Sequence, residues 1–392
     1  MLLTHLETAV EGIRTVQLDI PPGMIEFGAG QPSPGLLPLA LLKDAAAHRL
    51  SGRDLGLLAY GAEQGDGYFR LALAKFLSEH YQIEVSFDDL FITAGASQGL
   101  DLISTLFSRP GDTIFVEEPT YFLALRIFAD HGLNVVSLPM DENGLIVEAL
   151  EEKLSRHSPV FLYTIPTFHN PSSATLAAER RERLVQLSRR FQLLIVADEV
   201  YHMLSYSDAP PKPLASHIDS SHVLSLGSFS KIMAPGLRLG WIQGGTQLLQ
   251  RFTGCGLLDS GGGLNPFTSG IMRSAIENGR LENQLKKLKA AYSQRKTALV
   301  KALRDKLPET VRFVEPGGGF FIWLEFQEGI DTNHLLAAAV EQNVGFLPGV
   351  KFSAHNGLKN FARLSFSYYE VPQLEEGAGR LGKVIREFMK EE

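Results

Sequence analysis

Two kinds of hydrophobic pattern alternate along the chain between about residues 40 and 250. Short apolar runs rich in β-branched and aromatic residues are followed by longer stretches whose apolar residues recur at helical spacing. The stretch 176–191 is an example of a predicted helix, because its opposite face is charged. The predicted strands are 90–93, 113–117, 135–139, 160–166, 193–199, 222–228 and 239–245. This alternation predicts an α/β fold in which helices sandwich a mostly parallel central sheet.

A different pattern follows a loop that we predict at 258–266. A long charged helix is predicted over 280–306, and its charges are those of a solvated face. Beyond it the pattern is typical of an α+β unit. We expect strands at 311–316, 318–326 and 360–367, a further segment at 344–352, and helices at 332–342 and 373–390.

The chain is therefore divided into three parts. The segment 21–38 is dense in Pro and Gly and continues neither a helix nor a central strand, so we predict an N-terminal arm over residues 1–40. A large α/β domain follows over 41–280, and a smaller α+β domain over 281–392. The length of 392 residues agrees with two packed units, because single cores stop growing near roughly 250–300 residues.

Composition excludes several classes of partner. Lys and Arg number 37 and Asp and Glu 44, which gives a net charge of −7 with no basic patch, so nucleic acid is not an expected partner. No apolar run approaches the roughly 20 residues of a membrane helix, and the first residues lack the features of a secretory signal. Cys255 is the only cysteine, which suits a reducing compartment and a cytoplasmic location.

Candidate chemistry lies at the ends of predicted strands, where open α/β sheets bind their ligands. The strand 90–93 leads through small residues, Ala94-Gly95-Ala96-Ser97-Gln98-Gly99, into a predicted helix. Backbone N–H groups exposed at such a helix start form a phosphate cradle. By itself this segment is more simply described as a plain strand-to-helix connection.

Two further strand ends carry ionisable side chains. Asp198 ends an apolar strand and Tyr201 follows one helical turn later, so the carboxylate is either a helix cap or a buried anion for a protonated ring nitrogen. Lys231 lies between two apolar runs, and a desolvated lysine is a candidate nucleophilic amine. Ser228 and Arg238 flank it with groups suited to a phosphate.

Together these features call for one ligand with a phosphate, a protonatable ring nitrogen and an aldehyde. Pyridoxal 5′-phosphate has all three groups, and it acts as an electron sink that the protein must orient and protonate. No spacing of histidine, cysteine or carboxylate residues predicts a metal site. The residues therefore predict pyridoxal 5′-phosphate as the cofactor.

The chain resembles the fold-type-I pyridoxal-phosphate-dependent aminotransferases of class I/II over essentially its whole length. Within them it is most similar to the aminoadipate, kynurenine and aromatic branch. The matching motifs occur in the family's order: GAGQPSPGLLP, YGAEQGDGYFR, ITAGASQGLDL, EEPTYF, PTFHNPSS, ADEVY, GSFSKIMAPGLRLGW, PGGGFFIWL and ARLSFS.

The resemblance implies the catalytic roles. Lys231 would form the internal imine and then carry the proton between the substrate Cα and the cofactor. Asp198 would pair with the pyridinium nitrogen. Asn170 and Tyr201 would donate to the ring phenolate oxygen, and Tyr121 would stack on the ring.

The resemblance also implies the phosphate and substrate sites. The phosphate would be held by Ala96, Ser97, Gln98, Ser228, Ser230 and Arg238. Tyr60 would reach the phosphate of the neighbouring subunit, so a homodimer with shared active sites is expected. Arg363 would bind the substrate α-carboxylate together with Asn170 and the backbone of Gly30, which makes the arm a candidate lid.

Two segments depart from the family's pattern. The family usually has glycine after the serine of its NPS motif, where this chain has Ser173. The triplet Gly261 to Gly263 before Asn265 is also unusual, and it lies where the family places the cofactor phosphate and the subunit interface. His169, next to Asn170, is more simply explained by packing than by cofactor contact.

The main hypothesis is an aminotransferase that moves the amino group of an L-amino acid to a 2-oxo acid, with 2-oxoglutarate as the expected acceptor, by a ping-pong mechanism. The aromatic residues Tyr60, Tyr121 and Phe168 favour a large apolar or aromatic donor. A pyridoxal-phosphate lyase or decarboxylase remains open as an alternative, because the motifs do not fix which Cα bond breaks. A non-enzymatic ligand-sensing module is a third, less favoured reading, since only about twenty residues precede the arm segment.

Overall fold

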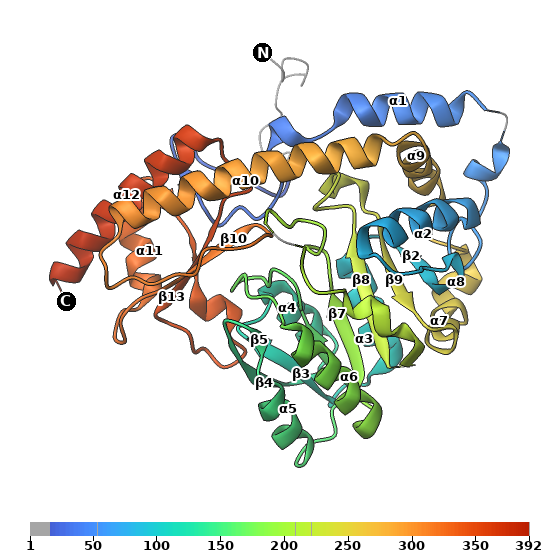
Figure 1. The fold of residues 1–392 in the computed structure, drawn as a ribbon, viewed down its shortest axis with the longest axis horizontal. Coiled ribbons are helices and arrows are strands. Elements are labelled where there is room, and N and C mark those ends of the chain that lie inside the picture. Colours follow the sequence, from blue (N-terminus) through green and yellow to red (C-terminus); the bar gives the residue numbers. More distant parts are fainter. Residues whose placement is uncertain (1–15, 53, 208, 221, 392) are drawn as a thin grey trace.

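The computed structural model describes residues 16–52, 54–207, 209–220 and 222–391, so the first fifteen residues of the predicted arm lie outside it. Its centre is a sheet of eight strands (Figure 1). In spatial order the strands are β2 (Leu90–Thr93), β9 (Gly240–Gly244), β8 (Val223–Ser228), β7 (Leu194–Asp198), β6 (Phe161–Thr164), β3 (Thr113–Glu118), β4 (Asn134–Asp141) and β5 (Gly144–Leu145).

The predicted mostly parallel sheet is confirmed. Neighbouring strands are parallel from β8 through β7, β6 and β3 to β4, while β9 runs antiparallel to both of its neighbours and β5 runs antiparallel to β4. Parallel strands end at the same edge of a sheet. The residues that follow β6, β7 and β8 are therefore brought together.

Helices cover both faces of this sheet, which explains why its central strands are almost continuously apolar. Alternate residues of each strand point to opposite faces. Phe115, Leu162 and Ile195 lie in a cluster with α5 (Val147–Leu154) and α6 (Ala178–Phe191), whereas Val116 and Val196 belong to the larger core on the other face.

The remaining helices of this part pack on the sheet or on one another, and α1 and α2 both contact α9. They are α1 (Leu39–Leu50), α2 (Gly67–Tyr81), α3 (Ala96–Phe107), α4 (Phe122–Asp130), α7 (Thr246–Thr253), α8 (Gly256–Gly261) and α9 (Pro266–Glu277). Short 3-10 helices are η1 (Pro34–Leu36), η2 (Leu55–Leu58), η3 (Phe87–Asp89), η4 (Leu214–Ser220), η5 (Pro235–Leu237) and η6 (Gly349–Phe352).

The C-terminal part has its own three-stranded antiparallel sheet. Its strands are β10 (Phe321–Glu325), β13 (Phe361–Ser365) and β12 (Leu347–Pro348), with β13 in the middle. The helices α10 (Arg280–Lys306) and α12 (Val371–Glu391) run together along its outer side, and α11 (Thr332–Glu341) packs on α12 (Figure 1). No helix of the described chain is long and apolar enough to cross a membrane.

The described part of the arm is attached to this C-terminal part. The strand β1 (Ile25–Glu26) pairs in parallel with β11 (Val344–Gly345). Buried Arg295 of α10 donates hydrogen bonds to Ser33 Oγ at 3.1 Å and to the carbonyl of Ser367 at 2.6 Å. The arm is thus held against the small sheet, while the domain boundaries at residues 40 and 280 stay a prediction.

Three local predictions were wrong. The segment 311–316 is not a strand, because it meets β10 through a single bridge between Arg312 and Glu325 before Pro316 and the glycine triplet that follows. The predicted loop at 258–266 contains the end of α8 and the start of α9. The predicted strand 160–166 ends at Thr164, since Pro166 has no N–H for the ladder.

Candidate active site

Asp198 ends β7 at the edge where the parallel strands finish. Its Oδ2 accepts a 2.9 Å hydrogen bond from the hydroxyl of Tyr163 on β6, whereas its buried Oδ1 has no hydrogen-bond partner among the described residues. Burial raises the pKa of the Asp198 carboxyl to about 6, although hydrogen bonds from Tyr163 and the Val200 backbone and the charge of Lys231 act in the opposite direction. A buried carboxylate oxygen without a partner fits a ligand that brings its own charged N–H.

Lys231 follows β8 and projects into the same region. Its Nζ donates a 3.0 Å hydrogen bond to the carbonyl oxygen of Gly30 in the arm. Burial, together with the positive charges of Arg363 and Arg238, lowers the pKa of Lys231 to about 8, while Asp198 partly opposes the shift. A lysine with a lowered pKa supplies the neutral amine that attacks an aldehyde carbon.

Arg363 reaches this region from β13 of the small sheet. Its Nη1 donates to Asn170 Oδ1 at 2.8 Å and its Nη2 donates to the carbonyl of Gly28 at 2.9 Å, while Nε is buried with no partner among the described residues. Its guanidinium lies 4.1 Å from the centre of the Phe321 ring. Burial lowers the pKa of Arg363 to about 10, so it remains a cation suited to a carboxylate.

Two tyrosines complete the polar cluster. The ring of Tyr201 is held edge-on by Phe320 and Phe321, with ring centres 5.5 and 5.8 Å away. Burial raises the pKa of Tyr201 well above its usual value, and a hydrogen bond with Asn170 counters this in part. Burial also raises the pKa of Tyr121 to about 12, with Asp198 adding to the shift. Both phenols therefore stay neutral.

The start of α3 is a candidate anion site at the edge of this cluster. Gly95 precedes the helix with a φ of +94°, and a Cβ there would lie 2.8 Å from Arg238 Nη2, so glycine is needed for the close approach. Arg238 donates to the carbonyl of Ala94 at 3.1 Å. The first turn of α3 carries Ala96, Ser97 and Gln98, whose backbone N–H groups are the free donors of a helix start.

Ser228 and Ser230 lie at and just after the end of β8, a strand that packs against α3. Ser228 is the last residue of β8, and its Oγ accepts a 3.1 Å hydrogen bond from the backbone N–H of Ser230. The structure thus brings together every predicted site residue except one. For Tyr60 no hydrogen bond or ring contact with this cluster is found among the described residues, and 87% of its surface is exposed.

The unusual glycine triplet lies next to Tyr60. Gly263 forms an antiparallel bridge with Gly61, and a Cβ on Gly263 would lie 1.8 Å from the carbonyl oxygen of Ala62. Asn265, two residues on, donates to the carbonyl of Arg238. The triplet therefore permits a close backbone contact with the loop that carries Tyr60, and Asn265 links the same segment to Arg238.

These protein groups match the three groups of one cofactor. The orphaned Asp198 oxygen suits a protonated ring nitrogen, Lys231 suits an aldehyde, and the α3 start with Arg238 suits a phosphate. A sequence profile of the family described as "Aminotransferase class I and II" matches residues 22–381.

The chain belongs to the class I and II aminotransferases. Accordingly this aminotransferase is an enzyme that uses pyridoxal 5′-phosphate to transfer amino groups between amino acids and 2-oxo acids. It is 37% identical over 374 residues to aromatic-amino-acid aminotransferase 1 of Thermococcus litoralis, which covers 94% of this chain and 89% of that protein.

Two further relatives place the aminotransferase in the same branch. It is 31% identical over 369 residues to 2-aminoadipate transaminase of Thermus thermophilus, which covers 93% of this chain and 91% of the relative. The crystal structure of a multiple substrate aminotransferase from Thermococcus profundus superposes with a TM-score of 0.89 at 35% identity, covering 95% of this chain and 93% of that one. The fold and family predicted from the sequence are confirmed.

The sequence analysis missed two parts of the aminotransferase site. Tyr163 was included in the predicted strand 160–166 without a role, although a buried phenol usually has a hydrogen-bond partner. The backbone carbonyl of Gly28, which accepts a hydrogen bond from Arg363, carried no signal in the sequence.

His169 is fully buried, with its Nε2 3.1 Å from Glu117 Oε2 and its Nδ1 3.0 Å from Ser172 Oγ.

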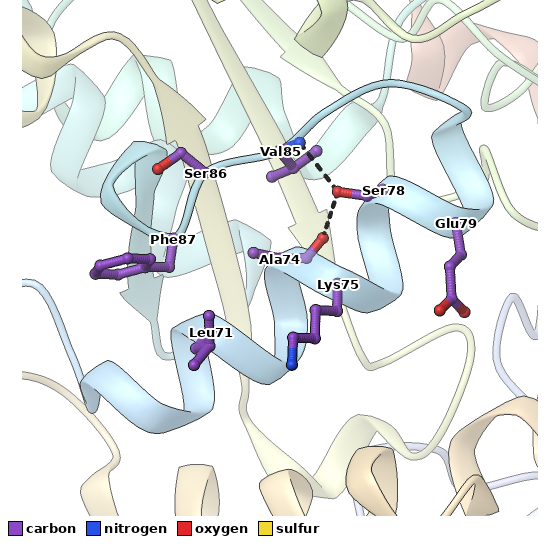
Figure 2. A pocket seen from close by; sticks show the side chains of 8 residues that line it. All are labelled: Leu71, Ala74, Lys75, Ser78, Glu79, Val85, Ser86 and Phe87. Atoms are coloured by element: carbon purple, nitrogen blue, oxygen red, sulfur yellow. Dashed lines mark hydrogen bonds between the residues drawn. The ribbon is translucent and has the colours of Figure 1, made fainter.

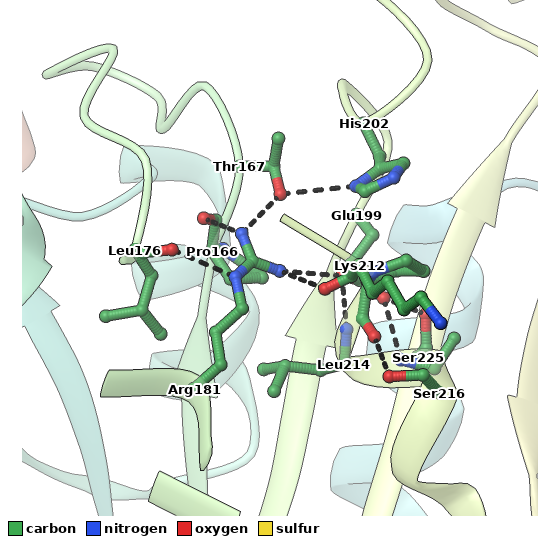
Figure 3. Close-up of polar contacts among 12 residues, drawn as sticks. Pro166, Thr167, Leu176, Arg181, Glu199, His202, Lys212, Leu214, Ser216 and Ser225 are labelled. Carbon is green, nitrogen blue, oxygen red and sulfur yellow. Dashed lines mark hydrogen bonds and ion pairs between the residues drawn. The ribbon is translucent and has the colours of Figure 1, made fainter. Parts of the chain in front are cut away.

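A buried ion pair beneath the sheet edge supports the loop that carries Asn170 (Figure 3). Arg181 of α6 donates to the carbonyls of Pro166 at 2.6 Å and Leu176 at 2.9 Å, which lie on either side of Asn170. Its Nη1 is 3.7 Å from Glu199 Oε1, and both side chains are almost fully buried. The pair therefore ties the Asn170 loop to the residue that follows Asp198.

The surface hollow in Figure 2 is separate from this cluster. It is a shallow groove of about 340 Å³ between α2 and η3, lined by Leu71, Ala74, Lys75, Ser78, Glu79, Val85, Ser86 and Phe87. None of these residues belongs to the site described above. In the described ranges no three His, Cys, Asp or Glu side chains are grouped to hold a metal ion.

Proposed function

We propose that this aminotransferase takes the amino group from a large apolar or aromatic L-amino acid and delivers it to 2-oxoglutarate, at a site formed by Lys231, Asp198 and Arg363. The observation that carries the proposal is the pair of buried, unpartnered atoms Asp198 Oδ1 and Arg363 Nε in one cluster with the Lys231 amine. Asp198 Oδ1 calls for a cation, which a protonated cofactor ring provides. Arg363 Nε calls for an anion, which a substrate carboxylate provides.

Bound pyridoxal phosphate supplies the electron sink for the bond made and broken at the substrate Cα. In this proposal Asp198 keeps the ring nitrogen protonated. Lys231 would hold the cofactor at its aldehyde carbon through the neutral amine, and the same amine would accept the proton from the substrate Cα. Its lowered pKa of about 8 suits a base that works near neutral pH.

The neighbouring residues position the cofactor. Asn170 and Tyr201 would donate to the ring oxygen, and Tyr121 would stack on the ring face. The phosphate would lie against the free N–H groups of the α3 start, within reach of Arg238. The hydroxyls and backbone that would contact it further are those of Ala96, Ser97, Gln98, Ser228 and Ser230.

Arg363 would hold the substrate α-carboxylate, with the Gly30 backbone as a second contact. The guanidinium is flanked by aromatic rings, with the centres of Phe321 and Phe352 4.1 and 5.1 Å away. Phe352 packs edge-on against Phe122 and Trp323. An aromatic wall beside the carboxylate site favours an apolar or aromatic side chain on the donor.

We also propose that the aminotransferase works as a homodimer in the cytoplasm. Tyr60 lies near other exposed apolar side chains of the same loop, since Leu55 and Leu58 are 77% and 74% exposed. A patch of this kind is typical of an interface. Tyr60 of each subunit would then contact the cofactor phosphate of the partner. The single Cys255 suits a reducing compartment.

Substrate choice is tested by steady-state assays of the purified enzyme with 2-oxoglutarate as acceptor. Phenylalanine, tyrosine, tryptophan, leucine, kynurenine and 2-aminoadipate serve as donors, with aspartate as the comparison. We expect kcat/KM to be highest for an aromatic or large apolar donor. A preference for aspartate would contradict the proposed donor class, while release of ammonia or carbon dioxide without glutamate would indicate lyase or decarboxylase chemistry.

The dimer is tested by mixing two inactive variants, Lys231→Ala and Tyr60→Ala. If the sites are shared, some mixed dimers regain one complete site, so activity returns on mixing. If mass spectrometry shows that subunits have exchanged and yet no activity returns, the sites are not shared.

A further inference from the structure

Tyr163 lies directly behind the carboxylate expected to face the cofactor ring. It is on β6 opposite Val196 of β7, and Asp198 lies two residues beyond Val196, so the two side chains share one face of the sheet. The Tyr163 hydroxyl donates to Asp198 Oδ2 at 2.9 Å. The ring is fully buried and lies edge-on to Phe128 of α4, with the ring centres 5.4 Å apart.

This contact makes the two oxygens of Asp198 different. Oδ2 is occupied by the phenol, whereas Oδ1 is buried and has no partner among the described residues. A hydrogen bond to a carboxylate stabilises its charged form. The phenol therefore orients the carboxylate, leaves one oxygen for the ligand and favours the charged form of the carboxylate.

We propose that Tyr163 is a positioning residue for transamination, whose hydroxyl fixes the Asp198 carboxylate and lowers its proton affinity so that the shared proton stays on the cofactor's ring nitrogen. The inference rests on the proposed role of Asp198 opposite that nitrogen. Tyr163 itself touches neither the substrate site around Arg363 nor the anion site at α3 in any contact of the described residues.

Other charged groups face this pair, and they stay the same when only the Tyr163 hydroxyl is removed. Glu199 points to the opposite face, where it lies 3.7 Å from Arg181 and accepts a 2.7 Å hydrogen bond from Ser225. The groups that act electrostatically on Asp198 or Tyr163 are Glu117, Tyr121, Glu199, Tyr201 and Lys231. A difference between wild type and Tyr163→Phe therefore reports the hydroxyl.

The first test is a spectroscopic pH titration of the visible band of the cofactor joined to Lys231. In Tyr163→Phe the carboxylate becomes more basic and draws the proton from the ring nitrogen. A less protonated ring withdraws fewer electrons from the nitrogen that links it to Lys231, which makes that nitrogen more basic. We therefore expect the midpoint of the titration to move up by about one pH unit. Cofactor affinity, measured by equilibrium dialysis, should fall about tenfold.

Kinetics separate positioning from general structure. We expect kcat of Tyr163→Phe to fall about tenfold while KM for the amino acid is unchanged, because Tyr163 does not contact the substrate site. The matched control is Tyr292→Phe, since Tyr292 is also fully buried and its hydroxyl has no hydrogen-bond partner among the described residues. That variant should keep the wild-type titration, affinity and kcat.

A second variant keeps the inference testable if Tyr163→Phe does not fold. Site-specific replacement of Tyr163 by 3-fluorotyrosine retains the ring and the hydroxyl but makes the phenol a stronger donor. The midpoint of the titration should then move down, opposite to the Phe variant. An unchanged midpoint in the variant that folds would overturn the role of Tyr163.

The variant Asp198→Asn separates the proposed role of Asp198 from the inferred role of Tyr163. If Asp198→Asn keeps wild-type spectrum and turnover, the proposed role of Asp198 fails and the inference about Tyr163 fails with it. If Asp198→Asn is impaired while Tyr163→Phe titrates, binds cofactor and turns over as wild type does, only the inference about Tyr163 is overturned.

Discussion

Lys231 and Gly30 are 201 positions apart in the chain, yet Lys231 Nζ donates a 3.0 Å hydrogen bond to the carbonyl oxygen of Gly30. Arg363 makes the matching contact with the carbonyl of Gly28 at 2.9 Å. The two cations that the proposal assigns to the cofactor and the substrate therefore hold one short segment of the arm. A plain linker would make no such contacts, so the arm belongs to the site.

The lowered pKa of Lys231 predicts how fast the enzyme takes up its cofactor at different pH. Only the neutral amine attacks an aldehyde, so below pH 8 the rate should rise about tenfold per pH unit, and it should level off above pH 8. The measurement is stopped-flow absorbance after pyridoxal phosphate is added to cofactor-free enzyme. A rate that keeps rising to pH 10 would mean that Lys231 has the pKa of an ordinary lysine.

Arg363 provides a check on that profile, because its positive charge is one cause of the lowered pKa of Lys231. In Arg363→Gln the levelling-off should move to higher pH. If the pH profile of Arg363→Gln is unchanged, Arg363 and Lys231 do not interact electrostatically.

Arg363→Gln should also lose recognition of the substrate carboxylate. Loss of one partner of a buried charge pair costs about 2–5 kcal/mol, so kcat/KM for an amino acid donor should fall roughly 30- to 5000-fold. The control substrate is the amine that lacks the carboxylate, such as phenethylamine in place of phenylalanine. Its slow reaction should change little, and an equal loss for both substrates would point to a damaged fold rather than to lost carboxylate binding.

The buried pair of Arg181 and Glu199 predicts a large effect on stability. Arg181→Met leaves Glu199 without its cation in a buried position, which should lower the free energy of unfolding by about 3–5 kcal/mol. Arg183→Met is the matched control on the same helix, because Arg183 is exposed and pairs with Glu151 at the surface. Arg183→Met should lower the free energy of unfolding by only about 0–1 kcal/mol, with both variants measured by urea titration. Similar costs for both variants would contradict this view of the buried pair.

The glycine triplet predicts a contrast between neighbouring positions. Gly263→Ala should destabilise the protein by about 1–3 kcal/mol, because its Cβ would overlap the carbonyl of Ala62. Gly261→Ala should be neutral, since nothing lies within 4 Å of the Cβ position. Urea unfolding of both variants, loaded with cofactor, measures the difference. A Gly263→Ala variant as stable as wild type would show that the Tyr60 loop adapts to the extra carbon.

The sequence predicted what depends on local pattern and on strand ends. Seven of the eight strands of the central sheet, α10 and the convergence of Asp198 with Lys231 follow from the apolar pattern and from polar residues at strand ends, whereas the two-residue strand β5 was not predicted. The contacts of Gly28 and Tyr163 were missed, because a backbone carbonyl carries no residue signal and the strand pattern does not show which residue a buried phenol contacts. The short strands β11 and β12 are too brief for a period-2 pattern to locate their ends.

The visible absorption spectrum of the purified enzyme tests the central claim most directly. It is recorded before and after each amino acid is added, then after 2-oxoglutarate, with Lys231→Ala measured in parallel. The account predicts a yellow band that bleaches to the pyridoxamine form with large apolar or aromatic amino acids and returns with 2-oxoglutarate. Lys231→Ala should retain some bound cofactor but show no turnover. A band that never converts to pyridoxamine, or wild-type turnover by Lys231→Ala, would contradict the account.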